Sequence, residues 1–125
     1  MEALRIESTY DSPQVIMDPE NNLFEISGKS LPEDVIDFYE PLLDWLNLYR
    51  KEPNPKTAFN IKLIYFNTAS SKLIMDILLI FEELIEEGRD IVIRWHSHTS
   101  DEDMQEAGKE YEEMIDVPFE HLSYV

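Results

Sequence analysis

The chain of 125 residues has no cysteine, only 3 glycines and only 10 lysine or arginine residues. Without cysteine it can use neither a disulfide framework nor a cysteine nucleophile nor a thiolate metal site. Its few glycines form no phosphate-binding loop, and no G-x-S-x-G nucleophile motif occurs. No apolar run reaches the roughly 18 residues of a membrane-spanning helix, and the start MEALRIEST lacks the basic and apolar segments of an export signal. We therefore expect a cytoplasmic protein.

The sequence is strongly acidic, with 27 aspartate or glutamate residues and a formal charge of −17. Most of the acidity lies between Asp76 and Asp116, where 14 acidic residues stand against 3 basic ones. Such a surface repels the phosphates of nucleic acids and anionic lipids, so we expect no direct binding to nucleic acid or membrane, whereas a basic protein patch would be attracted. Two interpretations of the charge stay open: solvated helix faces, and an acidic interaction protein that mimics nucleic acid.

Short strands are predicted for the first part of the chain. Apolar residues compatible with β-structure occupy residues 3–7, 14–17 and 22–27, and the sequence DPENN at 18–22 places Pro19 where a type I turn favours it. These features predict a β-hairpin. With 43% hydrophobic residues, the chain has enough apolar material for one core, and we expect a single domain that spans the whole chain.

A helix is predicted after the hairpin. Ser30 and Glu33 form a capping-box pattern, and Pro32 falls in the first turn, where its missing amide hydrogen does little harm. Pro41 removes a hydrogen bond inside this helix and is expected to kink or divide it. The apolar residues that recur at helical spacing are Val35, Phe38, Tyr39, Leu42, Leu46 and Tyr49.

The second half of the chain predicts a βαβ unit. Residues 58–66 are typical of a central strand, a helix runs from Thr68 to about Glu87 with Gly88 as its C-terminal cap, and residues 90–95 form the next buried strand. The crossover should be right-handed and the two strands parallel. The hydroxyl residues that follow the first strand then lie at its carboxyl end, where open α/β sheets usually place their sites.

A third helix and a last strand complete the predicted fold. Ser100 precedes an acidic first turn, an apolar helix face continues up to Pro118, and the tail PFEHLSYV is typical of an edge strand. The fold class is therefore α/β, with a mixed β-sheet and about three main helices. The apolar face of the third helix consists of Met104, Ala107, Tyr111 and Met114.

The segment YFNTASSK at residues 65–72 is the strongest candidate for a functional site, because an apolar strand ends there on hydroxyl residues that open a helix. The hydroxyl of Thr68 could cap that helix and contribute about 1 kcal/mol. A phosphate on Thr68 would instead face unsatisfied backbone amides and the positive end of the helix dipole. Ser70 and Ser71 are alternative acceptors or ordinary first-turn hydroxyls. The spacing alone leaves these interpretations open.

Three segments resemble the SiaC family of bacterial regulatory phosphoproteins: YFNTASSK, STYDSPQVIMDPENNLFEISGKSLPEDVIDFYEPLLDWL and DEDMQEAGKEYEEMIDVPF. The resemblance covers almost the whole chain. It implies a STAS-like fold, similar to the anti-sigma-factor antagonists that are phosphorylated on a hydroxyl at a helix start. In the family the threonine of an N-T-x-S motif accepts the phosphate, which implies Thr68, preceded by Asn67, as the phosphoacceptor of this chain.

The resemblance also implies the partners of the protein. A dedicated serine/threonine protein kinase would phosphorylate it, and a metal-dependent protein phosphatase would remove the phosphate. The unmodified form would bind and activate an effector such as a diguanylate cyclase, with cyclic di-GMP as the output. The protein itself would be a noncatalytic switch without a cofactor or a metal.

Two apolar residues in the helix after Thr68 fall outside its core-facing arc. Met75 and Leu79 lie on the opposite side, among Lys72, Asp76 and several glutamates. We expect them to contact a partner next to Thr68. Scattered exposed apolar residues are the alternative interpretation.

The main enzymatic alternative is a metal site in WHSHTSDED, residues 95–103. His96 and His98 could share one side of an extended segment and, with Asp101 or Asp103, supply nitrogen and oxygen ligands. Neither a third spaced ligand nor a general base is identifiable in the sequence. Histidines in a loop beside a helix cap are the simpler interpretation.

Overall fold

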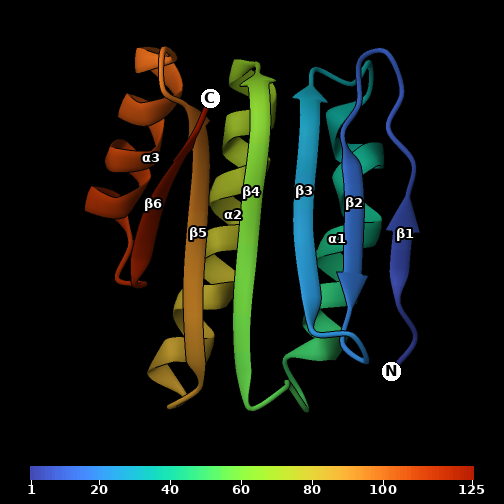
Figure 1. Cartoon of the computed structure of the whole chain (residues 1–125). Coiled ribbons are helices and arrows are strands. Elements are labelled where there is room, and N and C mark those ends of the chain that lie inside the picture. Colours follow the sequence, from blue (N-terminus) through green and yellow to red (C-terminus); the bar gives the residue numbers. More distant parts are fainter.

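The computed structural model describes all residues from 1 to 125, which form one six-stranded sheet with three helices on one face (Figure 1). The predicted α/β class with a mixed sheet is confirmed. The strands are β1 (Leu4–Ile6), β2 (Gln14–Asp18), β3 (Leu23–Ser30), β4 (Lys56–Phe66), β5 (Asp90–His98) and β6 (Phe119–Tyr124). The helices are α1 (Val35–Tyr49), α2 (Thr68–Glu86) and α3 (Glu102–Met114).

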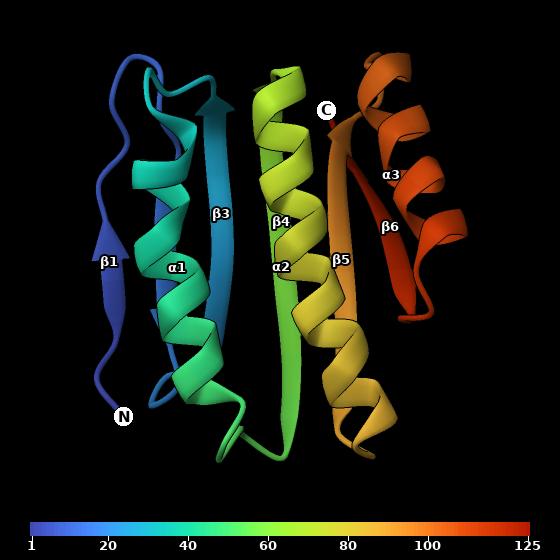
Figure 2. The same cartoon turned by 180° about the vertical axis from the view of Figure 1, so that it is seen from behind.

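The strands lie in the sheet in chain order, from β1 to β6. The first three strands pair in antiparallel fashion, and β2 and β3 form the predicted hairpin. The strands from β3 to β6 are parallel, and a helix connects each to the next. With the helices in front, the chain steps from β3 rightwards to β4, β5 and β6, which is the right-handed sense (Figure 2). The predicted parallel βαβ unit is therefore confirmed.

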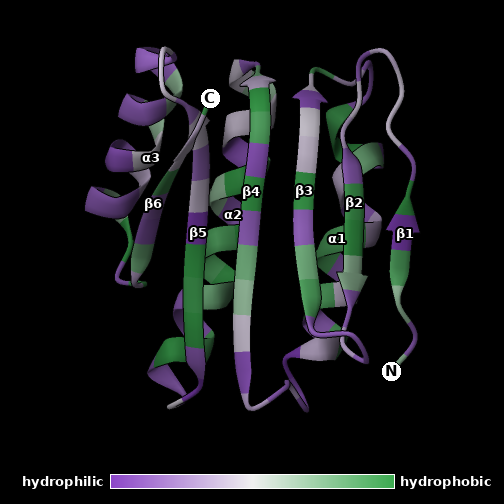
Figure 3. Cartoon of the chain, in the orientation of Figure 1, coloured by the Kyte–Doolittle hydropathy of each residue, from purple (hydrophilic) through white to green (hydrophobic).

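The core lies between the helices and one face of the sheet. In β4 the helix-facing residues Phe59, Ile61 and Leu63 are each 1% exposed, and Phe59 packs on Phe81 of α2 with ring centroids 5.2 Å apart. Polar and apolar residues alternate along the central strands (Figure 3), because successive side chains of a strand point to opposite faces. All three helices therefore cover the apolar side of the sheet.

The start of α1 differs from the prediction. Ser30 does not cap this helix, because it is the last residue of β3 and is fully buried. Its hydroxyl bonds instead to the hydroxyls of Tyr39 and Ser70. The cap is Asp34, whose carboxylate accepts a hydrogen bond from a first-turn amide, and the helix begins at Val35. The capping-box interpretation was wrong because the tertiary contacts of Ser30 outweigh its local pattern.

The helix α1 is not divided at Pro41, contrary to one of the two predicted outcomes. It runs without interruption from Val35 to Tyr49, and Pro41 is exposed on its outer side. The carbonyl that loses its intrahelical partner belongs to Asp37, which is also exposed. Water can satisfy that carbonyl, so the proline costs the helix little at this position.

Close packing of α3 on the sheet depends on Gly108. A Cβ atom at this position would lie 2.6 Å from Cδ1 of Trp95 in β5, which is closer than real Cβ atoms come. The indole nitrogen of Trp95 donates a 2.9 Å hydrogen bond to the carbonyl of Met104 in the first turn of α3. The absence of a side chain at Gly108 and this hydrogen bond together set the position of α3.

Candidate functional site

Thr68 lies at the junction of β4 and α2, as predicted, but it does not cap the helix. The cap is Asn67, whose side-chain oxygen accepts a 2.8 Å hydrogen bond from the backbone amide of Ser70. Asn67 has extended backbone angles, with φ −85° and ψ 174°, as cap residues do. Thr68 is the first residue of α2 and is exposed. The interpretation of Thr68 as the cap was therefore wrong, and its hydroxyl is not needed to hold the helix start.

The two neighbouring serines are much less accessible than Thr68. Ser70 is 0% exposed, and its hydroxyl donates a 2.9 Å hydrogen bond to the carbonyl of Ser30. Ser71 is half-buried as a residue, and its hydroxyl donates to the carbonyl of Thr68 at 2.9 Å. Thr68 is thus the most exposed of the three hydroxyl residues at the start of α2.

A buried group of hydroxyls ties the start of α2 to the rest of the fold. The hydroxyl of Ser30 at the end of β3 contacts those of Tyr39 in α1 and Ser70 in α2. The backbone amide of Asn67 donates a 3.0 Å hydrogen bond to the carbonyl of Ser30. Burial raises the pKa of Tyr39 to about 12, so this phenol stays protonated at physiological pH. The first turn of α2 is therefore held from two directions beneath the exposed Thr68.

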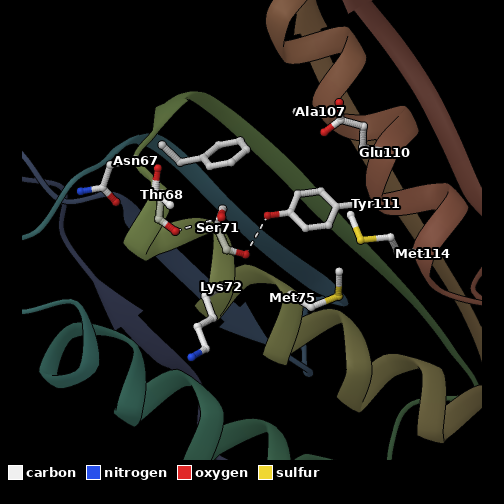
Figure 4. A pocket seen from close by; sticks show the side chains of 10 residues that line it. Asn67, Thr68, Ser71, Lys72, Met75, Ala107, Glu110, Tyr111 and Met114 are labelled. Atoms are coloured by element: carbon white, nitrogen blue, oxygen red, sulfur yellow. Dashed lines mark hydrogen bonds between the residues drawn. The ribbon is translucent and has the colours of Figure 1, made fainter.

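A groove between α2 and α3 opens directly beside Thr68 (Figure 4). Its volume is about 440 Å³, and one wall comes from the first two turns of α2 and the other from the second half of α3. Aromatic side chains from the end of β4 and from α3 lie between these walls. We call it the α2–α3 groove; its lining residues are Phe66, Asn67, Thr68, Ser71, Lys72, Met75, Ala107, Glu110, Tyr111 and Met114.

The α2–α3 groove has a positive end and a negative wall. Lys72 is its one basic side chain and lies one helical turn after Thr68, on the same face of α2. The first turn of α2 contains no acidic residue, so the positive end of the helix dipole is not neutralised there. Glu110 of α3 is the one acidic lining residue. A negative group is therefore better tolerated at Thr68 than along α3.

The structure separates the two residues that were expected to contact a partner. Met75 is half-buried, packs against the edge of the core and lines the α2–α3 groove. Leu79 is 40% exposed and does not line the groove. Both residues are accessible from the surface of α2, but only Met75 shares a concave surface with Thr68.

The groove residues of α3 were missed in the sequence. Ala107, Tyr111 and Met114 fit the expected apolar face, but Met114 is 61% exposed and belongs to the groove instead of the core. The sequence contains one signal of this arrangement, because Met114 stands at the very end of the apolar face, where the helix leaves the sheet. Which wall Met114 faces depends on the parallel packing of two helices, which periodicity cannot reveal.

The residues of the alternative metal site do not come together. The Nε2 atom of His96 bonds to the side-chain oxygen of Asn60 at 2.9 Å, and His98 bonds to the hydroxyl of Ser100. Asp101 is the N-cap of α3 and accepts a 3.0 Å hydrogen bond from the amide of Met104. No group of three or more histidine, aspartate or glutamate side chains is placed to hold a metal ion.

The environment of His96 also disfavours the metal site. Partial burial lowers the pKa of His96, and the positive charges of Lys62 and Arg94 lower it further. The carboxylate of Glu25 acts on this pKa in the opposite sense, but it forms a 3.0 Å ion pair with Lys62. The geometry therefore does not support the enzymatic alternative.

The three helices are α1, α2 and α3. None combines the length and the apolar character that crossing a lipid bilayer requires.

The structure is an α/β domain in which three helices cover one face of a mixed sheet and Thr68 is exposed beside the α2–α3 groove. The family model described as SiaC family regulatory phosphoprotein matches residues 6–124. The chain therefore belongs to the SiaC family.

Relatives from one bacterium support this assignment. An uncharacterized protein of Pseudomonas aeruginosa strain UCBPP-PA14 is 29% identical over 119 residues, which cover 95% of this chain and 94% of that protein. The structure of SiaC of Pseudomonas aeruginosa is 27% identical, with a TM-score of 0.90 and coverage of 99% of this chain and 100% of SiaC. A chain in the crystal structure of the diguanylate cyclase SiaD in complex with its activator SiaC, also from Pseudomonas aeruginosa, matches with a TM-score of 0.91 and 28% identity, covering 97% of this chain and 99% of that one.

Proposed function

We propose that this chain is a non-enzymatic partner-switching protein that is controlled by reversible phosphorylation of Thr68. In its unmodified form it binds and activates an effector, and a diguanylate cyclase is the class of effector that we favour. A serine/threonine protein kinase adds the phosphate and a metal-dependent protein phosphatase removes it. The observation that carries the proposal concerns Thr68 at the rim of the α2–α3 groove. Thr68 is exposed, and its hydroxyl is not used to cap α2.

The choice of acceptor follows from the hydrogen bonds at the start of α2. Asn67 caps the helix, and the hydroxyls of Ser70 and Ser71 already bond to backbone carbonyls. Phosphorylation of Thr68 therefore breaks none of these interactions. The fold is kept, and the change is confined to the surface that a partner meets.

The physical effect of the phosphate is local. It adds roughly −1.5 to −2 charges, which changes the total charge of −17 only slightly. Charges farther apart than about 8 Å are largely screened at physiological salt. A partner that packs against the neutral hydroxyl of Thr68 must instead accommodate a bulky dianion. Losing such a buried contact costs on the order of 2 to 5 kcal/mol, or roughly 30-fold to several-thousand-fold in affinity.

The effector class rests on the SiaC family and on the solved complex of its relative. The diguanylate cyclase SiaD is bound by its activator SiaC, and SiaC matches this chain over nearly its whole length. The surface that we assign to the effector includes Met75 inside the α2–α3 groove and Leu79 just beyond it. Both lie on the same helix as Thr68, so one partner can contact all three.

The experiment that tests this proposal locates the phosphate first. The chain is incubated with ATP and its cognate kinase or a lysate that contains it, and the modified residue is identified by mass spectrometry. We expect modification of Thr68 and its loss in Thr68→Ala, while Thr99→Ala, which changes another exposed threonine, is modified normally. Phosphate on another residue, or none at all, would overturn the assignment.

A further inference from the structure

The two edges of the sheet differ in length. The first edge is β1, which has only three residues, and so short a strand gives another chain little to pair with. The opposite edge is β6, which pairs with β5 through six consecutive residues and has no neighbouring strand on its outer side (Figure 1). The outer side of β6 is therefore the longer unpaired edge of this sheet.

The hydrogen bonds between β5 and β6 show which backbone groups of β6 are free. The carbonyl of Pro118 accepts from the amide of Ile93, and the carbonyl of Tyr124 accepts from the amide of Thr99, both at 2.9 Å. In a parallel pair, the backbone groups of every second residue point to the same neighbouring strand. Three residues of β6 therefore point both their amide and their carbonyl away from β5. These are Phe119, His121 and Ser123.

The strand β6 lacks the devices that usually protect an edge from other chains. It contains neither lysine nor proline, and its register with β5 runs without a bulge. Its one carboxylate, that of Glu120, lies 3.3 Å from the guanidinium of Arg94 in β5 and is therefore already paired. Five of its six residues are exposed. An extended segment of another chain can therefore reach this edge and form backbone hydrogen bonds with it.

The surface beside this edge is acidic on the side of the helices. The carboxylate of Glu112 in α3 lies 2.9 Å from Nε2 of His121, so this part of α3 is next to β6. Glu113 and Asp116 are exposed close to Glu112 in the chain, and Lys109 is the only basic residue of α3. A segment that pairs with β6 is therefore favoured when it carries lysine or arginine side chains.

The open face of the sheet offers apolar contacts to the same segment. Leu122 and Tyr124 of β6 are 37% and 41% exposed, although both are large apolar residues. They alternate with His121 and Ser123, so they lie on the face of the sheet that the helices leave uncovered. Side chains of an added strand would pack beside them as cross-strand neighbours.

We propose that the outer edge of β6 is an interaction surface at which an extended, basic segment of a partner protein adds a seventh strand to the sheet. The backbone of that segment bonds to the outward amides and carbonyls of β6. Its basic side chains lie beside Glu112 and Asp116, and its apolar side chains lie beside Leu122 and Tyr124. This surface goes beyond the proposed function and does not depend on the phosphorylation of Thr68.

A second copy of this chain is a poor occupant of the edge. Antiparallel pairing of β6 with the β6 of another copy would place the two α3 helices side by side on the same face of a joined sheet. Each α3 contains six acidic residues and one lysine, so the two helices would repel each other. A basic segment of a different protein brings no such repulsion.

The test uses a designed peptide of about eight residues in which lysines alternate with β-branched residues. One comparison peptide carries glutamate in place of lysine, and another is N-methylated at every amide, so that it donates no backbone hydrogen bond. Hydrogen exchange of the backbone amides of the full chain is followed by NMR at physiological salt. With the lysine peptide alone, we expect the amides of Phe119, His121 and Ser123 to exchange about tenfold more slowly or less.

A matched pair of substitutions at one position tests the backbone contact. Ser123→Pro removes an outward amide hydrogen, whereas Ser123→Ala keeps it, and neither change removes a hydrogen bond to β5. We expect Ser123→Pro to weaken binding of the lysine peptide about tenfold or more and Ser123→Ala to weaken it less than about twofold. Thermal unfolding of both variants checks that the fold is kept.

A second pair of variants, which leaves the backbone of β6 unchanged, tests the charges. Glu112→Gln with Asp116→Asn removes two charges beside β6. Asp103→Asn with Glu110→Gln removes two charges from the other side of α3, where both residues line surface hollows. We expect the first pair to weaken binding about threefold or more and the second pair to weaken it less than about twofold.

Several results would overturn the proposed edge surface. These are unchanged exchange of the three outward amides with the lysine peptide, equal slowing with the glutamate peptide or the methylated peptide, and equal binding by the two Ser123 variants. Equal weakening by the two pairs of charge variants would also contradict it. Slower exchange at higher protein concentration without peptide would assign the edge to a second copy instead of a basic partner.

Discussion

The hydroxyl of Tyr111 in α3 donates a 2.8 Å hydrogen bond to the backbone carbonyl of Ser71 in the first turn of α2. This bond joins the two walls of the α2–α3 groove three residues after Thr68. Tyr111 is only 5% exposed, and burial raises the pKa of its phenol, so the donor stays protonated. The spacing between the acceptor threonine and the apolar groove is therefore fixed by a specific contact.

Tyr111→Phe should loosen this connection while keeping the ring in place. We expect a loss of about 1 kcal/mol in the free energy of unfolding, since one partly buried hydrogen bond disappears. Urea denaturation measures the change. Tyr65→Phe is the control, because Tyr65 is 51% exposed and should lose almost nothing. Equal effects of the two substitutions would contradict the assigned role of Tyr111.

Stability should fall at alkaline pH because of the buried hydroxyl of Tyr39. Its pKa is about 12 in the folded protein, against 10.0 for an unperturbed tyrosine. The unfolded chain therefore loses this proton first, and the stabilising contribution is complete below pH 10 and is lost as the pH rises towards 12. The loss is on the order of 2 kcal/mol. Tyr39→Phe should show a smaller decrease between pH 10 and 12 in thermal unfolding, and an identical decrease would refute this account.

Asn67 and Thr68 should respond differently to truncation. Asn67→Ala removes the N-cap hydrogen bond to Ser70 and should cost about 1 kcal/mol, whereas Asn67→Asp should retain most of the stability. Thr68→Ala should change stability by less than about 0.5 kcal/mol, since Thr68 is exposed and does not cap. Chemical denaturation of the three variants provides the comparison. A cost for Thr68→Ala as large as that for Asn67→Ala would restore the capping role of Thr68.

Gly108→Ala should destabilise the protein, although alanine normally favours helices. The added Cβ would lie 2.6 Å from the ring of Trp95, which is 1% exposed and cannot move aside easily. We expect a net loss of about 1 to 3 kcal/mol. Denaturant unfolding followed by tryptophan fluorescence measures it. A gain in stability would mean that α3 can shift away from β5 without cost.

The parts of the fold that follow from local pattern were predictable from the sequence. The alternation in β4, the long apolar face of α2 and the glycine after α2 placed the central βαβ unit correctly; Gly88 indeed has a left-handed φ of +86°. The identity of the cap at α1 was not predictable in this way. Ser30 carries the stronger local signal, but its hydroxyl is used by Tyr39 and Ser70 from distant parts of the chain.

In the candidate site, too, the features set by local sequence were predictable, and those set by tertiary contacts were not. The segment around Thr68 could be located because a strand end, a cap residue and hydroxyls are adjacent in sequence. The α2–α3 groove could not, because it depends on contacts between residues about 40 positions apart, such as Tyr111 and Ser71. The exposure of Met114 follows from that packing and not from its spacing in α3.

The most direct measurement is the affinity of a diguanylate cyclase from the same organism for this chain before and after stoichiometric phosphorylation of Thr68, read together with the cyclic di-GMP that the cyclase forms. A phosphorylated Thr99→Ala sample controls for modification of another exposed threonine. We predict that the unmodified chain binds and activates the cyclase, and that phosphate on Thr68 weakens binding at least 30-fold and removes the activation. Equal affinity and equal activation with and without the phosphate would contradict the proposed switch.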